Sequence, residues 1–138
     1  MMTLPAGSQW DALSHVYYDG ELYNGYPAGA VTSFGATKNS IDKVDVKGIV
    51  GRGVLLDVAH HRGVPRLAPN TVIQPEDLDE VARAEGITMR SGDIVIVRTG
   101  WWGEFLEHRN GEEWTAGSPG VGWRVAEWLH KNESACLA

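Results

Sequence analysis

The 138 residues suffice for one folded domain, and the formal net charge of −6 argues against nucleic acid or an anionic membrane as a partner, because both bind clustered Lys and Arg. With 43% apolar and 22% charged residues, the chain has the composition of an ordinary globular protein, and no apolar run approaches the roughly 20 residues of a membrane span. A single cysteine, Cys136, excludes an internal disulfide and fits a reducing, cytoplasmic location.

A polar segment, "GSQWDALSH", occupies residues 7–15. If it is extended, Gln9, Asp11 and His15 point to one face, and Asp11 and His15 would also share a face of a helix. Carboxylate oxygens and imidazole nitrogens are ligands for zinc or manganese. Two ligands are too few for a tight site, so the spacing alone favours a surface ion pair or a capped loop.

Residues 16–46 are predicted to be rich in loops, because tyrosines alternate there with Gly, Asn, Asp and Pro in "YYDGELYNGYPAG". A tyrosine has an apolar body and a polar tip, which suits a pocket wall or a subunit interface. The alternative is a surface loop held in place by its aromatic residues. The next stretch, "ATKNSIDKV", predicts one short helical turn with Ser40 as its N-cap.

Residues 53–59, "GVLLDVA", predict a buried strand. Residues 75–85 give the clearest helix: Pro75 suits the first turn, Leu78 belongs to a narrow apolar stripe, and Gly86 ends it. Residues 94–97, "IVIV", predict a strand buried on both faces.

Trp101, Trp102 and Trp114 follow this strand, and they could line a site for a flat substrate or belong to a core or interface. The stretch 118–132 predicts a second helix that Ser118 caps and Pro119 begins. The apolar residues 135–138 read as the first part of a strand, which indicates a piece of a longer protein, or as a frayed tail. Alternating strands and helices predict an α/β domain.

The segment "AGSQWDALSH" resembles the signature H-x-G-T-H-x-D-x-P-x-H of the metal-dependent cyclase-like hydrolases, a family that includes bacterial kynurenine formamidase and isatin hydrolase. Gly7 matches the glycine, Ser8 stands for the threonine, Asp11 matches the aspartate ligand, and His15 matches the final, catalytic histidine. A branch with glutamine and tryptophan in the motif is similar over nearly the whole chain, in "YDGELYNG", "GATKNSIDKV", "GRGVLLDVA", "GDIVIVRTGW" and "SPGVGWRVAEWLH".

The chain departs from the family at the two metal-binding histidines, where it has Pro5 and Gln9. Glutamine offers a neutral carbonyl oxygen, whereas proline cannot replace a histidine. The family's later histidine and glutamate have no counterpart here. Four other histidines fall in no matching motif: His60, His61, His108 and His130. His60 and His61 are adjacent in sequence, and on a strand they would face opposite sides, which argues against a shared metal site.

The resemblance implies a swivelling β/β/α fold, with a mixed sheet or small barrel flanked by helices, as one domain over residues 1–138 that is truncated at both ends. It implies a homo-oligomeric hydrolase of an aryl formamide, lactam or related small molecule. It also implies the following roles: zinc or manganese held by Asp11 and Gln9, proton transfer by His15, and substrate binding by Trp10, Tyr17, Tyr23 and Tyr26.

A second hypothesis is a truncated or degenerate chain that serves as a non-catalytic binding or assembly module. The lost histidines favour this hypothesis, and the retained Asp11 and His15 favour the hydrolase.

Overall fold

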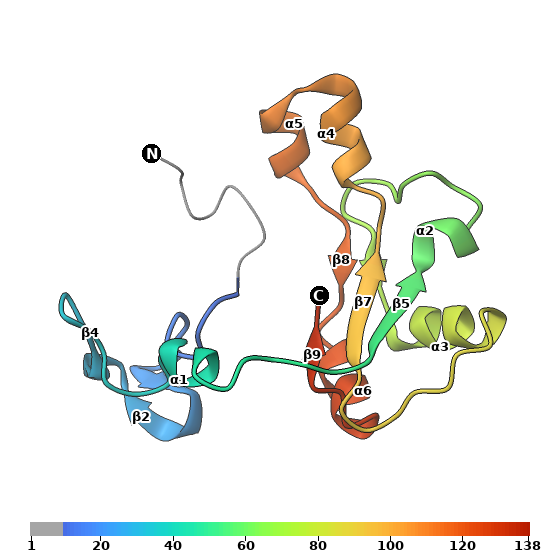
Figure 1. The fold of residues 1–138 in the computed structure, drawn as a ribbon. Coiled ribbons are helices and arrows are strands. Elements are labelled where there is room, and N and C mark those ends of the chain that lie inside the picture. Colours follow the sequence, from blue (N-terminus) through green and yellow to red (C-terminus); the bar gives the residue numbers. More distant parts are fainter. Residues whose placement is uncertain (1–9) are drawn as a thin grey trace. The chain divides into compact units, whose positions relative to one another are not determined.

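The computed structural model describes residues 10–138, which form two compact units (Figure 1). The first unit ends at Val50 and the second spans Gly51–Ala138. Across residues 10–138, no helix has the length and apolarity needed to cross a bilayer.

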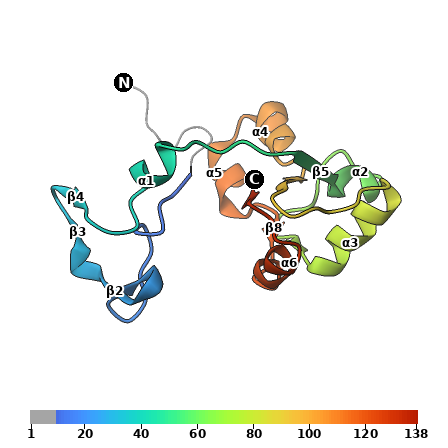
Figure 2. The ribbon, with the colours of Figure 1, turned by 60° about the horizontal axis from the view of Figure 1, so that its bottom comes forward.

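The first unit consists of short elements joined by turns, and Figure 2 shows them from a second direction. Two antiparallel hairpins pair β1 with β2 and β3 with β4. The elements in chain order are β1 Glu21–Leu22, η2 Tyr23–Gly25, β2 Tyr26–Pro27, η3 Ala28–Ala30, β3 Val31–Thr32, β4 Gly35–Ala36 and α1 Asp42–Asp45.

Between residues 10 and 50, the only buried side chain is that of Leu22, whereas Phe34 is fully exposed. This stretch therefore has no hydrophobic core of its own. The predicted helical turn is confirmed as α1, but Ile41 is its N-cap, and the Ser40 hydroxyl instead accepts a hydrogen bond from Lys43 Nζ at 3.2 Å.

The second unit alternates strands and helices, as the sequence predicted. A three-stranded parallel sheet has the order β5-β7-β9, and a second parallel pair joins β6 to β8. The elements are β5 Gly53–Asp57, α2 Val58–His61, β6 Val72–Ile73, α3 Pro75–Ala84, β7 Ile94–Arg98, α4 Trp102–His108, α5 Gly111–Ala116, β8 Gly120–Val121, α6 Val125–Lys131 and β9 Cys136–Leu137.

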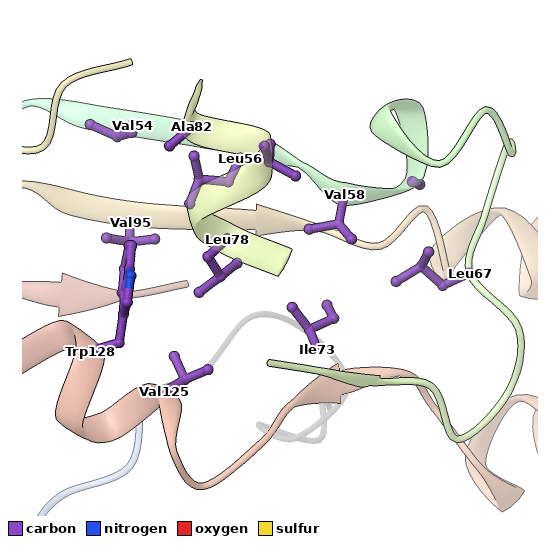
Figure 3. Packing of buried hydrophobic residues seen from close by; sticks show 12 residues of the cluster. Val54, Leu56, Val58, Leu67, Ile73, Leu78, Ala82, Val95, Val125 and Trp128 are labelled. Carbon is purple, nitrogen blue, oxygen red and sulfur yellow. The ribbon is translucent and has the colours of Figure 1, made fainter. Parts of the chain in front are cut away.

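One hydrophobic core lies between one face of this sheet and the helices α3 and α6 (Figure 3). Leu56 and Val95 extend from the sheet, Leu78 from α3, and Val125 and Trp128 from α6. The α/β class predicted from the sequence is confirmed, and in residues 10–138 the strands form small sheets rather than a closed barrel.

The predicted helix at 75–85 is confirmed as α3. The Asp77 carboxylate accepts a hydrogen bond from the backbone N–H of Gln74 at 2.7 Å, and Pro75 occupies the first helical position, where a missing N–H costs nothing. Gly86 follows with a φ of +67°, which favours glycine and ends the helix.

Two strand predictions need correction. The strand predicted at residues 53–59 is β5, and it ends at Asp57. The Asp57 carboxylate accepts a hydrogen bond from the backbone N–H of His60 at 2.9 Å and so caps α2. β7 is not buried on both faces: Val95 is buried, but Ile96 is exposed, as is Leu55 beside it in β5. The helices of this unit cover one face of the sheet only.

The helix predicted from Ser118 begins instead at Val125. The backbone N–H of Gly120 donates to Thr71 at 3.0 Å and that of Gly122 donates to Ile73 at 2.8 Å, so this stretch forms β8 beside β6. A side chain on Gly122 would press on Val72 and Gln74, which explains why glycine allows this pairing.

Candidate functional site

The segment that carries Asp11 and His15 is a turn, neither a strand nor a helix. The backbone N–H of His15 donates to the carbonyl of Ala12 at 2.9 Å. Both the Asp11 carboxylate and the His15 imidazole are exposed, as is Trp10. The shared strand or helix face on which the spacing argument rested is therefore absent from residues 10–15, and Gln9 lies outside the described residues.

Asn39 joins this turn to the tyrosine-rich loop. Its carbonyl accepts from the backbone N–H of Ser14 at 3.2 Å, and its side-chain Nδ2 donates to the carbonyl of Tyr23 at 2.7 Å. Asn39 has a φ of +57°, a conformation that asparagine tolerates better than most residues. Sequence reasoning missed Asn39, although an asparagine between a loop and a short helix is typical of such a bend.

The tyrosines predicted to bind substrate lie on the surface of the first unit. Tyr17 and Tyr23 are exposed, and Tyr26 is half-buried beneath Lys38, whose Nζ lies 5.0 Å from the centre of the ring. In residues 10–50 the structure records no packed pair of aromatic rings. Their assignment to a substrate pocket stays a prediction.

Asp11 and His15 do not form a complete metal centre with the rest of the described chain. Over residues 10–138, no three side chains of the His, Cys, Asp and Glu types come close enough together to hold a metal ion. A zinc site needs at least three protein ligands, so the described residues alone do not fit a resident divalent ion.

The comparisons with known proteins identify the family. A family model described as "Putative cyclase" matches residues 1–138.

The chain belongs to this cyclase family.

A crystal structure described as that of a novel cyclase is similar to the chain, with a TM-score of 0.84 and 31% sequence identity. The match covers 93% of this chain and 44% of that one, so the chain spans less than half the length of that cyclase. The search of curated proteins found no match. Family membership confirms the resemblance read from the motif.

A second polar cluster of this cyclase-family chain lies at the carboxyl ends of β5 and β7. Arg98 Nη1 donates to both carboxylate oxygens of Asp57, at 2.8 and 3.0 Å. Partial burial raises the pKa of Asp57, but the backbone N–H of His60 and the Arg98 guanidinium outweigh this effect and leave the pKa below its usual range. Sequence reasoning did not single out this pair, although a charged residue of opposite sign at the end of each of two parallel strands could have indicated it.

The tryptophans after β7 divide between interior and surface. Trp101 is buried, and its indole N–H donates to the carbonyl of Trp114 at 3.1 Å. Trp102 remains 54% exposed, with its ring centre 5.0 Å from that of Phe105 and 5.7 Å from that of Trp114. His60 and His61 lie in the short helix α2 and are both exposed, so they do not stand on opposite faces of a strand.

Proposed function

We propose that this chain is part of a hydrolase that cleaves a small carbonyl compound, namely an aryl formamide, a lactam or a related amide or ester. The supporting observation is that Asp11 and His15, the residues that the resemblance matches to the aspartate and the catalytic histidine of the family motif, are both exposed on one turn. The Asn39 hydrogen bonds hold this turn against the tyrosine-rich loop, which is the surface on which a substrate would lie.

In this proposal His15 transfers the protons. It removes a proton from the attacking water as the new C–O bond forms, and it returns a proton to the leaving nitrogen as the C–N bond breaks, so that an amide and water give a carboxylic acid and an amine. Asp11 orients the water or the imidazole. Trp10, Tyr17 and Tyr23 supply exposed rings for an aromatic substrate.

The described ligands for a divalent ion are incomplete, so no step of this proposal passes through a metal. An assembled enzyme that holds zinc or manganese needs ligands besides Asp11 and His15. The proposed role of His15 in proton transfer does not depend on which residues supply those ligands.

The test is hydrolysis of an aryl formamide and of a lactam, with and without added zinc or manganese. The His15→Ala variant should lower the rate by about 10²–10⁴-fold, the usual contribution of a general acid–base group. His130→Ala is the matched control, because His130 is exposed at the end of α6. Equal rates for wild type and His15→Ala would remove His15 from catalysis.

A non-catalytic assembly module is the second candidate. It is favoured by the near absence of buried side chains between residues 10 and 50, since a surface of this kind gains stability by packing on a partner. Wild-type chain that associates but turns over neither substrate, with or without metal, would support this candidate over the hydrolase.

A further inference from the structure

A groove of about 560 Å³ lies at the carboxyl ends of the parallel strands β5 and β7, entirely within the second unit. Ligands of α/β proteins commonly bind at this edge of a parallel sheet, and the volume is within the range of small-molecule sites. The residues that matter are Leu55 and Ile96 from the exposed face of the sheet, Arg66, Arg98 and Trp102.

The two loops that form the groove are fixed against one another. The backbone N–H of Leu67 donates to the carbonyl of Thr99 at 2.9 Å. Gly100 has a φ of +71°, and a Cβ at this position would collide with the Pro65 carbonyl oxygen and the Arg66 backbone. Since the loops already meet this closely, the groove is preformed, and a ligand would spend little free energy on ordering it.

One part of the groove is apolar and aromatic. Leu55 and Ile96 are exposed there, and the Trp102 ring packs against the rings of Phe105 and Trp114. Exposed apolar side chains beside a supported indole ring offer a surface to a flat ring, because stacked and edge-to-face aromatic contacts both stabilise such a pair.

The other part carries two guanidinium groups whose N–H donors are only partly used. Arg98 Nη1 donates to the Asp57 carboxylate, and Arg98 Nη2 lies 3.5 Å from the Pro65 carbonyl oxygen. Arg66 has Nε 2.7 Å from Glu104 and Nη1 2.5 Å from Glu107. Across residues 10–138 no acceptor meets Arg98 Nε or Arg66 Nη2, although a guanidinium has five N–H donors.

The acidic partners of these arginines stand outside the groove. Asp57, Glu104 and Glu107 are absent from its lining, whereas Arg66 and Arg98 belong to it. The groove therefore presents N–H donors next to a surface for a flat ring.

We infer that this groove binds a small aromatic carboxylate, with the ring against Leu55, Ile96 and Trp102 and the carboxylate on Arg66 and Arg98. A carboxylate is the acceptor that matches the planar fork of a guanidinium. The site uses no residue of the first unit, so it goes beyond the proposed hydrolase function and does not depend on His15.

The test compares 2-naphthoate with 2-naphthamide, which has the same ring and no charge, by calorimetric titration of the full chain. Naphthoate should bind about tenfold more tightly than the amide, as expected for a hydrogen bond to a charged group, and less tightly at high salt. Naphthoate should also shift the indole N–H signal of Trp102 in an NMR spectrum, assigned by its loss in Trp102→Phe. Equal affinities for the two probes, or shifts confined to other indoles, would overturn the inference.

Substitutions locate the site. Arg98→Gln and Arg66→Gln should each weaken naphthoate binding about tenfold, whereas Glu107→Gln should tighten it, because a neutral amide competes less strongly than a carboxylate for Arg66 Nη1. The matched controls are Arg83→Gln, an exposed arginine of α3 that does not line the groove, and His15→Ala. Both should bind naphthoate as the wild type does.

Circular dichroism decides which variants are folded. Arg98→Gln also removes the partner of Asp57, so if it unfolds, Glu107→Gln and Trp102→Ala decide instead, since both side chains are exposed. Unchanged naphthoate affinity in the folded variants would refute the site.

Discussion

Replacement of Leu78 by alanine tests whether the core between the sheet and α3 holds the second unit together. Leu78 is 0% exposed and belongs to the buried cluster that also contains Leu56 and Val95. Alanine is the best helix former, so the substitution leaves α3 intact and removes packing alone.

The magnitude follows from the burial. Leu→Ala removes roughly three carbon groups at about 0.8 kcal/mol each, or somewhat more than 2 kcal/mol of transfer free energy. The cavity left behind adds to this, so the free energy of unfolding should fall by about 2–5 kcal/mol. The melting temperature should fall by on the order of 10–20 °C for a domain of this size.

Urea unfolding followed by circular dichroism and tryptophan fluorescence measures this loss, and Trp128 in the same cluster is a local reporter. Leu106→Ala is the matched control, because Leu106 is also helical but 53% exposed, and its loss should cost no more than about 0.5 kcal/mol. If both variants lose the same stability, the burial of Leu78 does not stabilise the unit as argued.

Three further predictions follow from the structure. Calorimetric titration with zinc or manganese should show weak binding that Asp11→Ala abolishes, because the described residues supply only two aligned ligands; a tight site that survives Asp11→Ala would contradict this. Sedimentation should show an associating chain rather than a stable monomer, since aromatic side chains such as Phe34 and Trp123 are exposed; a compact monomer that binds no hydrophobic dye would refute it. The Arg52 guanidinium holds the pKa of Asp93 below its usual range, so the pair stabilises the fold above the ordinary carboxyl pKa of about 3.9, and this contribution is lost as the pH falls through the lowered value. The urea midpoint should therefore fall at acid pH, less steeply in Asp93→Asn, and equal slopes would exclude the pair as a cause.

The sequence predicted α3 and β7 correctly because their signals are local. Pro75, the acidic first turn and Gly86 mark both ends of the helix, and the β-branched run at 94–97 marks the strand. Burial of β7 on both faces was wrong, because an apolar run does not reveal how many faces of a sheet the helices cover.

The start of α6 depends on a partner far along the chain. Ser118 and Pro119 look like a helix start, but the backbone at Gly120 and Gly122 pairs with β6. A tertiary hydrogen bond therefore overrode a local capping signal, and nothing near Ser118 in the sequence announces it.

The residue types of the candidate site stay a prediction, and the geometry of the site could not be read from the sequence. Asp11 and His15 were found through the family motif, whereas their turn and its attachment to Asn39 depend on backbone contacts across the loop. The groove near Arg98 was missed, because Arg66 and Arg98 meet only through the folded sheet edge.

The parallel pairing of β5 with β7 has a consequence for how the chain folds. Arg52 and Asp93, the pair that flanks this contact, are 41 residues apart in sequence, so the contact closes a long loop and forms slowly compared with a helix. Until then, the run Ile94–Val97 is an unpaired apolar strand of the kind that aggregates. Asp93 and Arg98 bracket it with opposite charges, and charged residues at the ends of such a run oppose edge-to-edge association. The two side chains that later pair with Arg52 and Asp57 thus also keep the nascent strand in solution.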